Sequence, residues 1–369
     1  MAKNAVENED IKFFPKKYKK QSIQLLEKFI DWNISRQVVW GIRIPAYFCK
    51  SEEKWFVSEE IPAKCKLCGE NDFVQDEDTF DTWFSSGQWP YSTLKTESES
   101  FFNYFYPTSV IETGHDILRP WVLRMIMLGI FATGNVPFKT VFLHGMVRDR
   151  KGVKMSKSKG NVINPLEMVE KYGADALRAA LVFGIKEGAD VPLSDDKVIG
   201  MRNFANKMWN MGRFLQVNDE KSKASEFIGH QPQSLQVPDL ASSTVLSPNI
   251  SKETIKLLKQ LKKEFETEQI KYHKHMELFQ FSKALDLVYH FMWHKYADIY
   301  IEKLKEPLQS GNIEVLKTLK QVYFQNLRLL HPYMPFVTEA VWQVFNGEKS
   351  SLLEVQGITN ETYTSTKKS

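Results

Sequence analysis

Several features are scarce or missing in this 369-residue sequence, and each excludes a class of protein. The cysteines, Cys49, Cys65 and Cys68, are too few for a disulfide framework and favour a reducing, cytoplasmic location. No run of about 18 consecutive apolar residues is present, so we expect no membrane span. Residues 1–10 are polar and acidic and lack the basic and apolar regions of a signal peptide. The net charge of +4 permits an anionic partner without demanding one.

The first half of the sequence has the pattern of an α/β domain. Up to about Pro192, short β-branched or aromatic runs alternate with helical segments. Residues 141–143 are expected to form a buried strand and residues 116–131 an apolar helix. Asn164-Pro165 predicts the start of the next helix, and Gly173 predicts its end.

The second half has a helical pattern and predicts an all-α bundle. Ser194 is a suitable N-cap for a long helix whose apolar face runs to Leu215. Residues 216–250 are rich in Ser, Gln, Asp and Pro and are interpreted as a linker or an excursion from the bundle. Further helices are expected at about 251–275, 278–305 and 313–330, and a final helix is expected to open after His331-Pro332-Tyr333-Met334-Pro335 and to run through Phe345.

The segment Lys154-Met155-Ser156-Lys157-Ser158 has the composition of a phosphate-binding loop. Its lysines can bring ammonium groups to a polyphosphate, and its serines offer hydroxyl donors. Taken alone, such a basic run is just as typical of a solvated surface. Here it follows His144-Gly145, at the end of the predicted strand, where open parallel sheets bind nucleotides.

Several motifs, in chain order, resemble the class I aminoacyl-tRNA synthetases. The run from His144 to Arg178 is similar to their second signature. The other matching segments are Ile30-Asp31-Trp32-Asn33-Ile34-Ser35-Arg36-Gln37 with Trp40-Gly41 and Arg43-Ile44-Pro45, Asp81-Thr82-Trp83-Phe84-Ser85-Ser86 with Trp89-Pro90, Thr113-Gly114-His115-Asp116-Ile117-Leu118, 202–210 and 330–336. Asp-Thr-Trp-Phe-Ser-Ser followed by Trp-Pro is most similar to valyl enzymes, with isoleucyl specificity as the alternative.

The resemblance implies a fold and a domain order. Residues 1–193 would be the second half of a Rossmann-like α/β catalytic domain that carries the lysine loop. Residues 194–345 would be a helical-bundle anticodon-binding domain, and 346–369 a flexible tail.

The resemblance also implies roles for individual residues in the ATP- and Mg²⁺-dependent activation of valine. Gly114 and Asp116 would hold the ATP ribose, while His144, Gly145 and Met146 would meet the adenine. Lys154, Ser156, Lys157 and Ser158 would bind the phosphates, with Lys154 and Lys157 in the catalytic role. Trp83, Ile117 and Trp121 would line the valine pocket. Ordinary core packing is the alternative for all three, most of all for Ile117.

The three cysteines suggest half of a zinc knuckle. Cys65 and Cys68 have the Cys-x-x-Cys spacing, Cys49 stands at the first position of a partner pair, and Glu52 occupies the second. Three thiolates and one carboxylate are not the usual structural set. A bound zinc and a metal-free remnant of a zinc site both remain open.

One expected element is missing: the His-x-Gly-His turn with which class I enzymes stabilise the transition state at the α-phosphate. The nearest similar run, Phe227-Ile228-Gly229-His230, follows the lysine loop and lies in the predicted linker, where it cannot serve this role. The family's editing domain is missing as well. Residues Met1 to Phe14 resemble the stretch that follows this insertion in the family, so we expect the chain to start mid-protein.

Three readings follow. The chain is the carboxyl-terminal part of a valine–tRNA ligase that works with valine, tRNA(Val) and a separately encoded amino-terminal half. Alternatively, it is a tRNA-binding module without catalysis. The third reading is an inactive truncated product.

Overall fold

The computed structural model describes residues 1–369 except 157, 159, 229–249, 348–349 and 353–369, and only the backbone of 222–228. The chain folds into two compact units, 1–145 and 146–369. The predicted domain boundary at 193/194 therefore lies inside the second unit. This division arises because the helices just after the lysine loop pack into the helical core. In the part of the chain that the structure describes, no helix has the length and apolarity needed to cross a bilayer.

The first unit is built on a three-stranded parallel sheet in the order β1-β8-β7. Its strands are β1 (Lys12–Phe14), β7 (Thr108–Gly114) and β8 (Phe138–His144). Val141 and Leu143 in β8 are fully buried, and the strand predicted at 141–143 is confirmed. Parallel pairing places the carboxyl ends of β7 and β8 together at one edge of the sheet.

Helices bury the apolar sides of this sheet in one core that includes Val6, Phe13 and Ile126. The helical segments of the unit are α1 (Ala2–Glu7), α2 (Lys17–Glu27), α3 (Thr82–Ser86), α4 (Trp89–Lys95), α5 (Glu99–Phe105), the 3₁₀ turn η1 (His115–Ile117), the π-helical turn η2 (Leu118–Val122) and α6 (Leu123–Thr133). The helix predicted at 116–131 thus begins as a 3₁₀ and then a π turn. Pro120, which has no N–H to donate, lies within the π turn.

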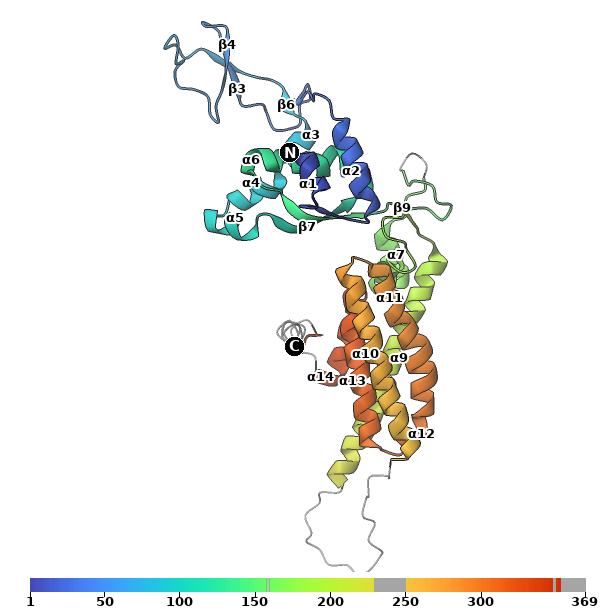
Figure 1. The fold of residues 1–369 in the computed structure, drawn as a ribbon. Helices are drawn as coiled ribbons and strands as arrows, with labels where there is room; N and C mark the ends of the chain where they lie inside the picture. The colour runs from blue at the N-terminus through green and yellow to red at the C-terminus, as the bar shows by residue number, and fades with distance from the viewer. Residues whose placement is uncertain (157, 159, 229–249, 348–349, 353–369) are drawn as a thin grey trace, which may run out of the picture. The chain divides into compact units, whose positions relative to one another are not determined.

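Two small antiparallel sheets lie between α2 and α3 in the sequence. β2 (Ser35–Arg36) pairs with β6 (Thr79–Phe80), and the second sheet has the order β4-β3-β5. Its strands are β3 (Ala46–Cys49), β4 (Lys54–Val57) and β5 (Phe73–Gln75). Figure 1 shows β3 and β4 side by side as a hairpin.

The second unit begins with the strand β9 (Val147–Arg148), which pairs in parallel with β10 (Val191–Pro192). Between them lie α7 (Pro165–Tyr172) and α8 (Ala174–Ala180). The Asn164 side chain accepts from the Leu166 N–H, and Gly173 ends α7 with a φ of 91°. Both predicted boundaries of this helix are confirmed.

The rest of the unit is the predicted bundle, whose long helices run side by side (Figure 1). Its helices are α9 (Asp195–Ile228), α10 (Lys252–Glu277), α11 (Phe281–His290) continuing as the π-helix η4 (Phe291–Ile301), α12 (Lys305–Gln309), α13 (Ile313–Leu330) and α14 (Pro335–Asn346). The linker predicted at 216–250 is wrong for 216–228, which extend α9. Of the remainder, 229–249, including His230, lie outside the described residues.

Part of the segment predicted as a flexible tail packs against α14. Leu352 is completely buried, its N–H donates to the Glu339 carboxylate, and the Trp342 indole donates to Ser350 Oγ over 3.0 Å. The prediction is therefore wrong at these positions, because Leu352 adds apolar surface to the bundle core. Residues 348–349 and 353–369 lie outside the described part of the chain.

Buried tyrosines tie the bundle helices together. The hydroxyl groups of Tyr272, Tyr296 and Tyr323 donate to the carbonyls of Leu329, Leu319 and Met208, over 2.7, 2.8 and 2.6 Å. Each bond joins two helices that are distant in sequence and satisfies a hydroxyl that water does not reach. Burial raises the pKa of Tyr272 to about 12.

Candidate functional site

The clearest site geometry in the first unit is at the carboxyl edge of its parallel sheet. Gly114, the last residue of β7, pairs in register with His144, the last residue of β8. Asp116 follows in η1 with an exposed side chain. Three of the predicted ATP-binding residues therefore come from the two adjacent strand ends. Loops at this edge of a parallel sheet are where such folds bind nucleotides.

His144 is held in place by its neighbours. Its Nδ1 lies 2.8 Å from the Gly145 carbonyl, which can only accept, so Nδ1 is the protonated nitrogen of this contact. Its Nε2 lies 3.2 Å from Oε1 of Glu112 on β7. The imidazole therefore bridges the ends of both strands.

The residues predicted to line the valine pocket occupy neighbouring elements. Trp83 is on α3 and faces a cleft of about 710 Å³, whereas Ile117 and Trp121 are not among the residues that line it. Trp121 on η2 donates its indole N–H to the Ser86 carbonyl over 3.1 Å, which fastens η2 to the end of α3. Its ring also lies 6.4 Å from that of Trp89. The assignment of these three residues to one pocket stays a prediction.

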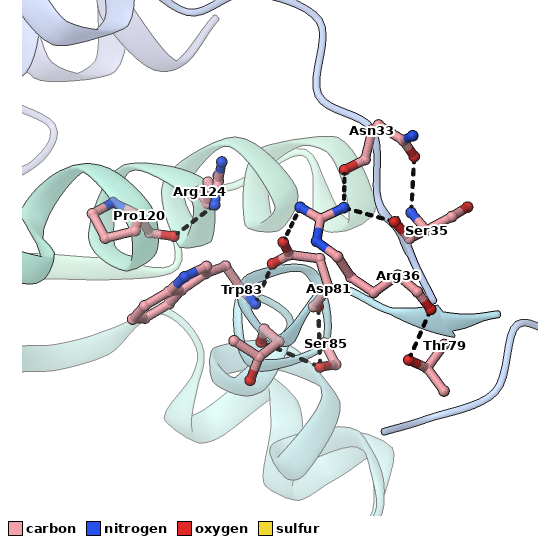
Figure 2. A network of polar contacts seen from close by, with 10 residues as sticks. Asn33, Ser35, Arg36, Thr79, Asp81, Trp83, Ser85, Pro120 and Arg124 are labelled. Carbon is pink, nitrogen blue, oxygen red and sulfur yellow. Dashed lines mark hydrogen bonds and ion pairs between the residues drawn. The ribbon is translucent and has the colours of Figure 1, made fainter. Parts of the chain in front are cut away.

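An ion pair between Arg36 and Asp81 orders the wall of this cleft (Figure 2). The Asp81 carboxylate is buried and also caps α3 by accepting from the Trp83 N–H over 2.7 Å. Arg36 donates in addition to the carbonyls of Asn33 and Ser35, over 2.8 and 2.7 Å. The pair therefore joins two segments 45 residues apart in the sequence. Both segments belong to motifs that resemble the class I enzymes, but neither motif carries a signal that the two side chains pair.

A second cation anchors the same region. The Arg124 guanidinium on α6 lies 3.5 Å from the centre of the Trp32 ring, close enough for a cation–π contact. Its Nη1 also donates to the Pro120 carbonyl in the π turn η2 over 3.4 Å (Figure 2). The segment containing Trp32 is thereby attached to the helices beside the parallel sheet.

The lysine loop lies in the second unit, where internal hydrogen bonds order it. The Ser156 N–H donates to Oδ1 of Asn161 over 3.0 Å, and the hydroxyls of Ser156 and Ser158 lie 3.2 Å apart. Lys154 is exposed and forms an isolated antiparallel bridge with Arg148. Lys157 lies outside the described residues. The loop thus presents one described lysine and two serine hydroxyls to solvent.

Met146, at the base of this loop, already has partners for both of its backbone polar groups. Its N–H donates to Oδ1 of Asp190 over 2.8 Å, and its carbonyl accepts from the Val191 N–H over 2.9 Å. Asp190 also pairs with Arg148. A contact from the Met146 N–H to adenine would compete with Asp190, whereas the carbonyl keeps a second lone pair.

The three cysteines lie together at the end of the β3–β4–β5 sheet. Their sulfur atoms all lie within 4.8 Å of one another, and the Sγ atoms of Cys49 and Cys68 are 3.8 Å apart. A tetrahedral zinc with Zn–S bonds of about 2.3 Å holds its sulfurs roughly 3.8 Å apart. Glu52 is not part of this cluster. The sulfurs fit zinc, but the predicted carboxylate does not complete the set.

Backbone donors favour the thiolate form that zinc requires at Cys65 but not at Cys68. A backbone bond from Glu70 lowers the pKa of the Cys68 thiol, but burial and the neighbouring sulfurs of Cys65 and Cys49 raise it overall. Hydrogen bonds from the backbone N–H groups of Cys68 and then Leu67 lower the pKa of the Cys65 thiol. The Leu67 N–H lies 3.5 Å from Cys65 Sγ. Gly69, with a φ of 79°, supplies the left-handed turn that folds the chain around the sulfur.

Comparisons with known proteins agree with this geometry. Residues 1–194 match the family model of "tRNA synthetases class I (I, L, M and V)", and residues 248–368 match "Anticodon-binding domain of tRNA ligase". The chain belongs to the class I aminoacyl-tRNA synthetases. Its fold is accordingly an α/β part with a parallel sheet followed by a helical anticodon-binding domain.

Curated relatives within this class I family carry the name "Valine--tRNA ligase". The chain is 42% identical to the Thermus thermophilus protein over 351 residues, covering 94% of this chain and 38% of that protein. It is 40% identical to the Clostridium tetani protein over 364 residues, covering 95% and 38%. The chain thus corresponds to a valyl-like region and spans a little over a third of the length of these relatives.

Solved class I synthetases share the fold. A ternary complex of Agrobacterium radiobacter K84 LeuRS with tRNA and LeuAMS matches with a TM-score of 0.66 and 22% identity, covering 90% of this chain and 44% of that one. Mycobacterium tuberculosis methionyl-tRNA synthetase bound to methionyl-adenylate matches with a TM-score of 0.63 and 19% identity, covering 90% and 58%. At these identities the likeness extends to the fold alone.

Proposed function

We propose that the chain supplies the carboxyl-terminal part of a valine–tRNA ligase active site. The observation that carries the proposal is the paired strand ends at Gly114 and His144, in a chain about 40% identical to valine–tRNA ligases. A separate amino-terminal half would supply the His-x-Gly-His turn. In that enzyme Gly114, Asp116, His144 and Gly145 would hold the nucleoside of ATP, with Met146 offering its carbonyl.

The proposed reaction is adenylate formation. A carboxylate oxygen of valine attacks the α-phosphorus of ATP, a new P–O bond forms, and the bond to the β-phosphate bridging oxygen breaks. Pyrophosphate leaves with that electron pair. A terminal ribose hydroxyl of tRNA(Val) would then attack the valyl carbonyl of the adenylate, forming an ester bond as the bond to phosphate breaks and AMP leaves. Lys154, together with Lys157 and the hydroxyls of Ser156 and Ser158, would stabilise the charge that accumulates on the departing phosphates. Mg²⁺ would neutralise part of the same charge.

Valine selection would depend on the apolar walls beside α3 and η2. Trp83, Ile117 and Trp121 would form the pocket, and the Arg36–Asp81 pair would hold Trp83 in place through the cap of α3. An apolar pocket separates valine from isoleucine or threonine by only about 1–3 kcal/mol. We therefore expect valine to be preferred, with its isostere threonine and the larger isoleucine as competitors.

The three cysteines would hold a structural zinc. Cys49, Cys65 and Cys68 would be the protein ligands, with the fourth position taken by a group other than Glu52. The metal would fasten the loop that contains Cys65 and Cys68 to β3, which carries Cys49. In this role it would act on stability and take no part in the reaction.

The decisive experiment is valine-dependent exchange of pyrophosphate into ATP. The full chain is assayed alone and after mixing with an amino-terminal half that carries the His-x-Gly-His turn. Exchange that appears only in the mixture, and with valine above isoleucine, supports the proposal. Exchange that stays absent in a mixture that forms a stable complex contradicts it.

A second function is favoured by the match to the anticodon-binding domain. The helical unit would bind tRNA by itself, without catalysis. Binding by the isolated chain should weaken as salt rises, because cations leave the RNA on association. Failure to prefer the valine tRNA over an unrelated tRNA would argue against this role.

A further inference from the structure

The side chain of Asn161 makes a set of contacts to the lysine loop that the proposed roles leave unexplained. We call Asn161 and its partner Asp149 the latch. Asn161 lies beyond the loop, yet its carboxamide contacts the loop at two places. Oδ1 accepts from the Ser156 N–H over 3.0 Å, and Nδ2 donates to the Lys154 carbonyl over 3.3 Å. The same Nδ2 donates to Oδ2 of Asp149 over 2.8 Å. One side chain thus joins Asp149, before the loop, to the loop backbone at Lys154 and Ser156.

Asp149 is a firm anchor for this contact. Its other oxygen, Oδ1, accepts from the N–H groups of Lys151 and Val153, over 2.9 and 2.8 Å. The turn is closed by the bond from the Gly152 N–H to the Asp149 carbonyl, and Gly152 has a φ of 74°. Hydrogen bonding from Asn161, and then from Val153, lowers the pKa of Asp149. Asp149 is therefore an ionised acceptor held by its own turn.

Outside these contacts, the described part of the loop is held by weaker ones, such as the bond from the Ile163 N–H to Met155 Sδ over 3.3 Å and the 3.2 Å contact between the Ser156 and Ser158 hydroxyls. Between β9 and α7, the described residues form no strand or α-helix apart from the isolated bridge at Lys154. A loop without such constraints must lose backbone entropy of roughly 1–2 kcal/mol per residue when it closes on a ligand. A latch that already fixes the backbone at Lys154 and Ser156 removes part of that cost.

We propose that Asn161 is a positioning residue that, anchored by the Asp149 carboxylate, holds the Lys154 and Ser156 backbone ready for a polyphosphate. The ligand class named here, a polyphosphate, rests on the proposed function. The existence of the latch rests only on the hydrogen bonds of Asn161 and Asp149. Asn161 does not need to touch the phosphates, because its two loop contacts are to backbone atoms.

The test removes each of the two side chains of the latch, Asn161 and Asp149, in turn and then exchanges them. In Asn161→Ala the carboxamide is lost. In Asp149→Asn the remaining side-chain oxygen still accepts from the N–H groups of Lys151 and Val153. The new amide nitrogen then faces Nδ2 of Asn161, so two donors meet and the bond between the two side chains is lost. The double variant D149N/N161D restores a donor–acceptor pair between positions 149 and 161 and lets the carboxylate at position 161 accept from the Ser156 N–H. It has no donor for the Lys154 carbonyl, so we expect the recovery to be partial. Asn164→Ala, which removes the cap of α7 without touching the latch, is the matched control.

The first measurement is trypsin cleavage after Lys154 in the full chain without ligand, followed by mass spectrometry. Both single variants should be cleaved about tenfold faster than the parent, the equivalent of one charge-assisted hydrogen bond. D149N/N161D should return toward the parent rate, and Asn164→Ala should match the parent. Equal cleavage rates in the parent and both single variants would overturn the latch.

The second measurement is the affinity of the full chain for inorganic tripolyphosphate by titration calorimetry. We expect the dissociation constant to rise about tenfold in each single variant. In D149N/N161D it should return to within about threefold of the parent value. Parent-like affinity in both single variants would overturn the positioning role while leaving the proposed function intact. No binding by the parent chain would instead count against the phosphate grip of the proposed function, and the cleavage rates would then decide the latch.

Discussion

The carboxylate of Asp175 on α8 accepts the first free N–H groups of α14, which lies 161 residues further along the chain. Oδ1 accepts from the Phe336 N–H over 3.1 Å, and Oδ2 from the Val337 N–H over 2.6 Å. Met334, the residue before α14, provides no side-chain cap. A residue of α8 therefore caps the last helix of the bundle, which explains why α7 and α8 fold with the second unit.

Asp175→Asn should destabilise the helical unit, because a carboxamide accepts only one of the two N–H groups and presents a donor to the other. The expected loss is about 1–3 kcal/mol in the free energy of unfolding. Urea unfolding followed by far-UV circular dichroism measures it. Glu302→Gln, at an exposed site with only a surface ion pair, should stay within about 0.5 kcal/mol. Equal midpoints for the two variants would contradict the capping role.

His331 should make the same unit less stable in mild acid. It is buried and bonded through Nδ1 to Thr338 Oγ1 over 2.7 Å, and burial lowers its pKa. A histidine with a folded pKa below the unfolded value of about 6.5 takes up its proton first in the unfolded chain. The contribution of His331 to the free energy of unfolding is therefore complete above the unfolded pKa and is lost as the pH falls from there toward the folded pKa.

Unfolding midpoints of the parent chain and His331→Gln, measured between pH 7.5 and 5, test this. The parent should lose stability more steeply than the variant over that interval. His273, whose pKa burial also lowers, remains in both proteins and sets the common background slope. Parallel pH profiles would show that His331 does not carry the effect.

Features that depend on neighbouring residues could be predicted from the sequence. Asn164 and Gly173 bound α7 because a cap and a left-handed turn act within one helical turn. The strand at 141–143 and the helix at 313–330 follow from continuous apolar patterns. The metal-ligand spacing of Cys65 and Cys68 is equally local.

Features that join distant segments could not be predicted. Nothing in the sequence pairs Arg36 with Asp81 or Asp175 with the start of α14. The error at 216–228 has a different cause. A polar composition indicated a linker, but a surface helix needs only one buried face. Pairs such as Gln216 with Glu220, 2.9 Å apart, and Asp219 with Lys320, 2.7 Å apart, support its polar face.

Gly212 on α9 should tolerate no side chain. A Cβ at this position would lie 2.8 Å from Val341 Cγ1 on α14 and 3.0 Å from the Tyr323 hydroxyl on α13. Gly212→Ala should cost about 1–3 kcal/mol by forcing these helices apart. Gly200→Ala, on the same helix with no atom within 4 Å of the added Cβ, should be neutral or stabilising by up to about 1 kcal/mol. Thermal melts of the two variants provide the comparison, and the opposite order would refute the close approach.

Bound zinc should protect all three cysteines from a thiol reagent, and its affinity should not depend on nearby carboxylates. One equivalent of Zn²⁺ should block the reaction of Cys49, Cys65 and Cys68 with a thiol reagent, and a strong chelator should restore it. Cys68→Ser should weaken the metal affinity by at least about tenfold, whereas Glu52→Gln should leave it unchanged. Competition with a chromophoric chelator gives the affinities. A matching loss in Glu52→Gln would show that the carboxylate joins the ligand set.

Lys154→Ala should impair the chemical step far more than valine binding in the enzyme completed with an amino-terminal half. Its ammonium group would meet phosphate oxygens whose charge grows as pyrophosphate departs, so the contact strengthens in the transition state. We expect kcat for pyrophosphate exchange to fall by about 100-fold with little change in the KM for valine. Lys139→Ala, which removes an exposed charge from β8, controls for net charge. A rise in the KM for valine that matches the loss in kcat would reject the role assigned to Lys154.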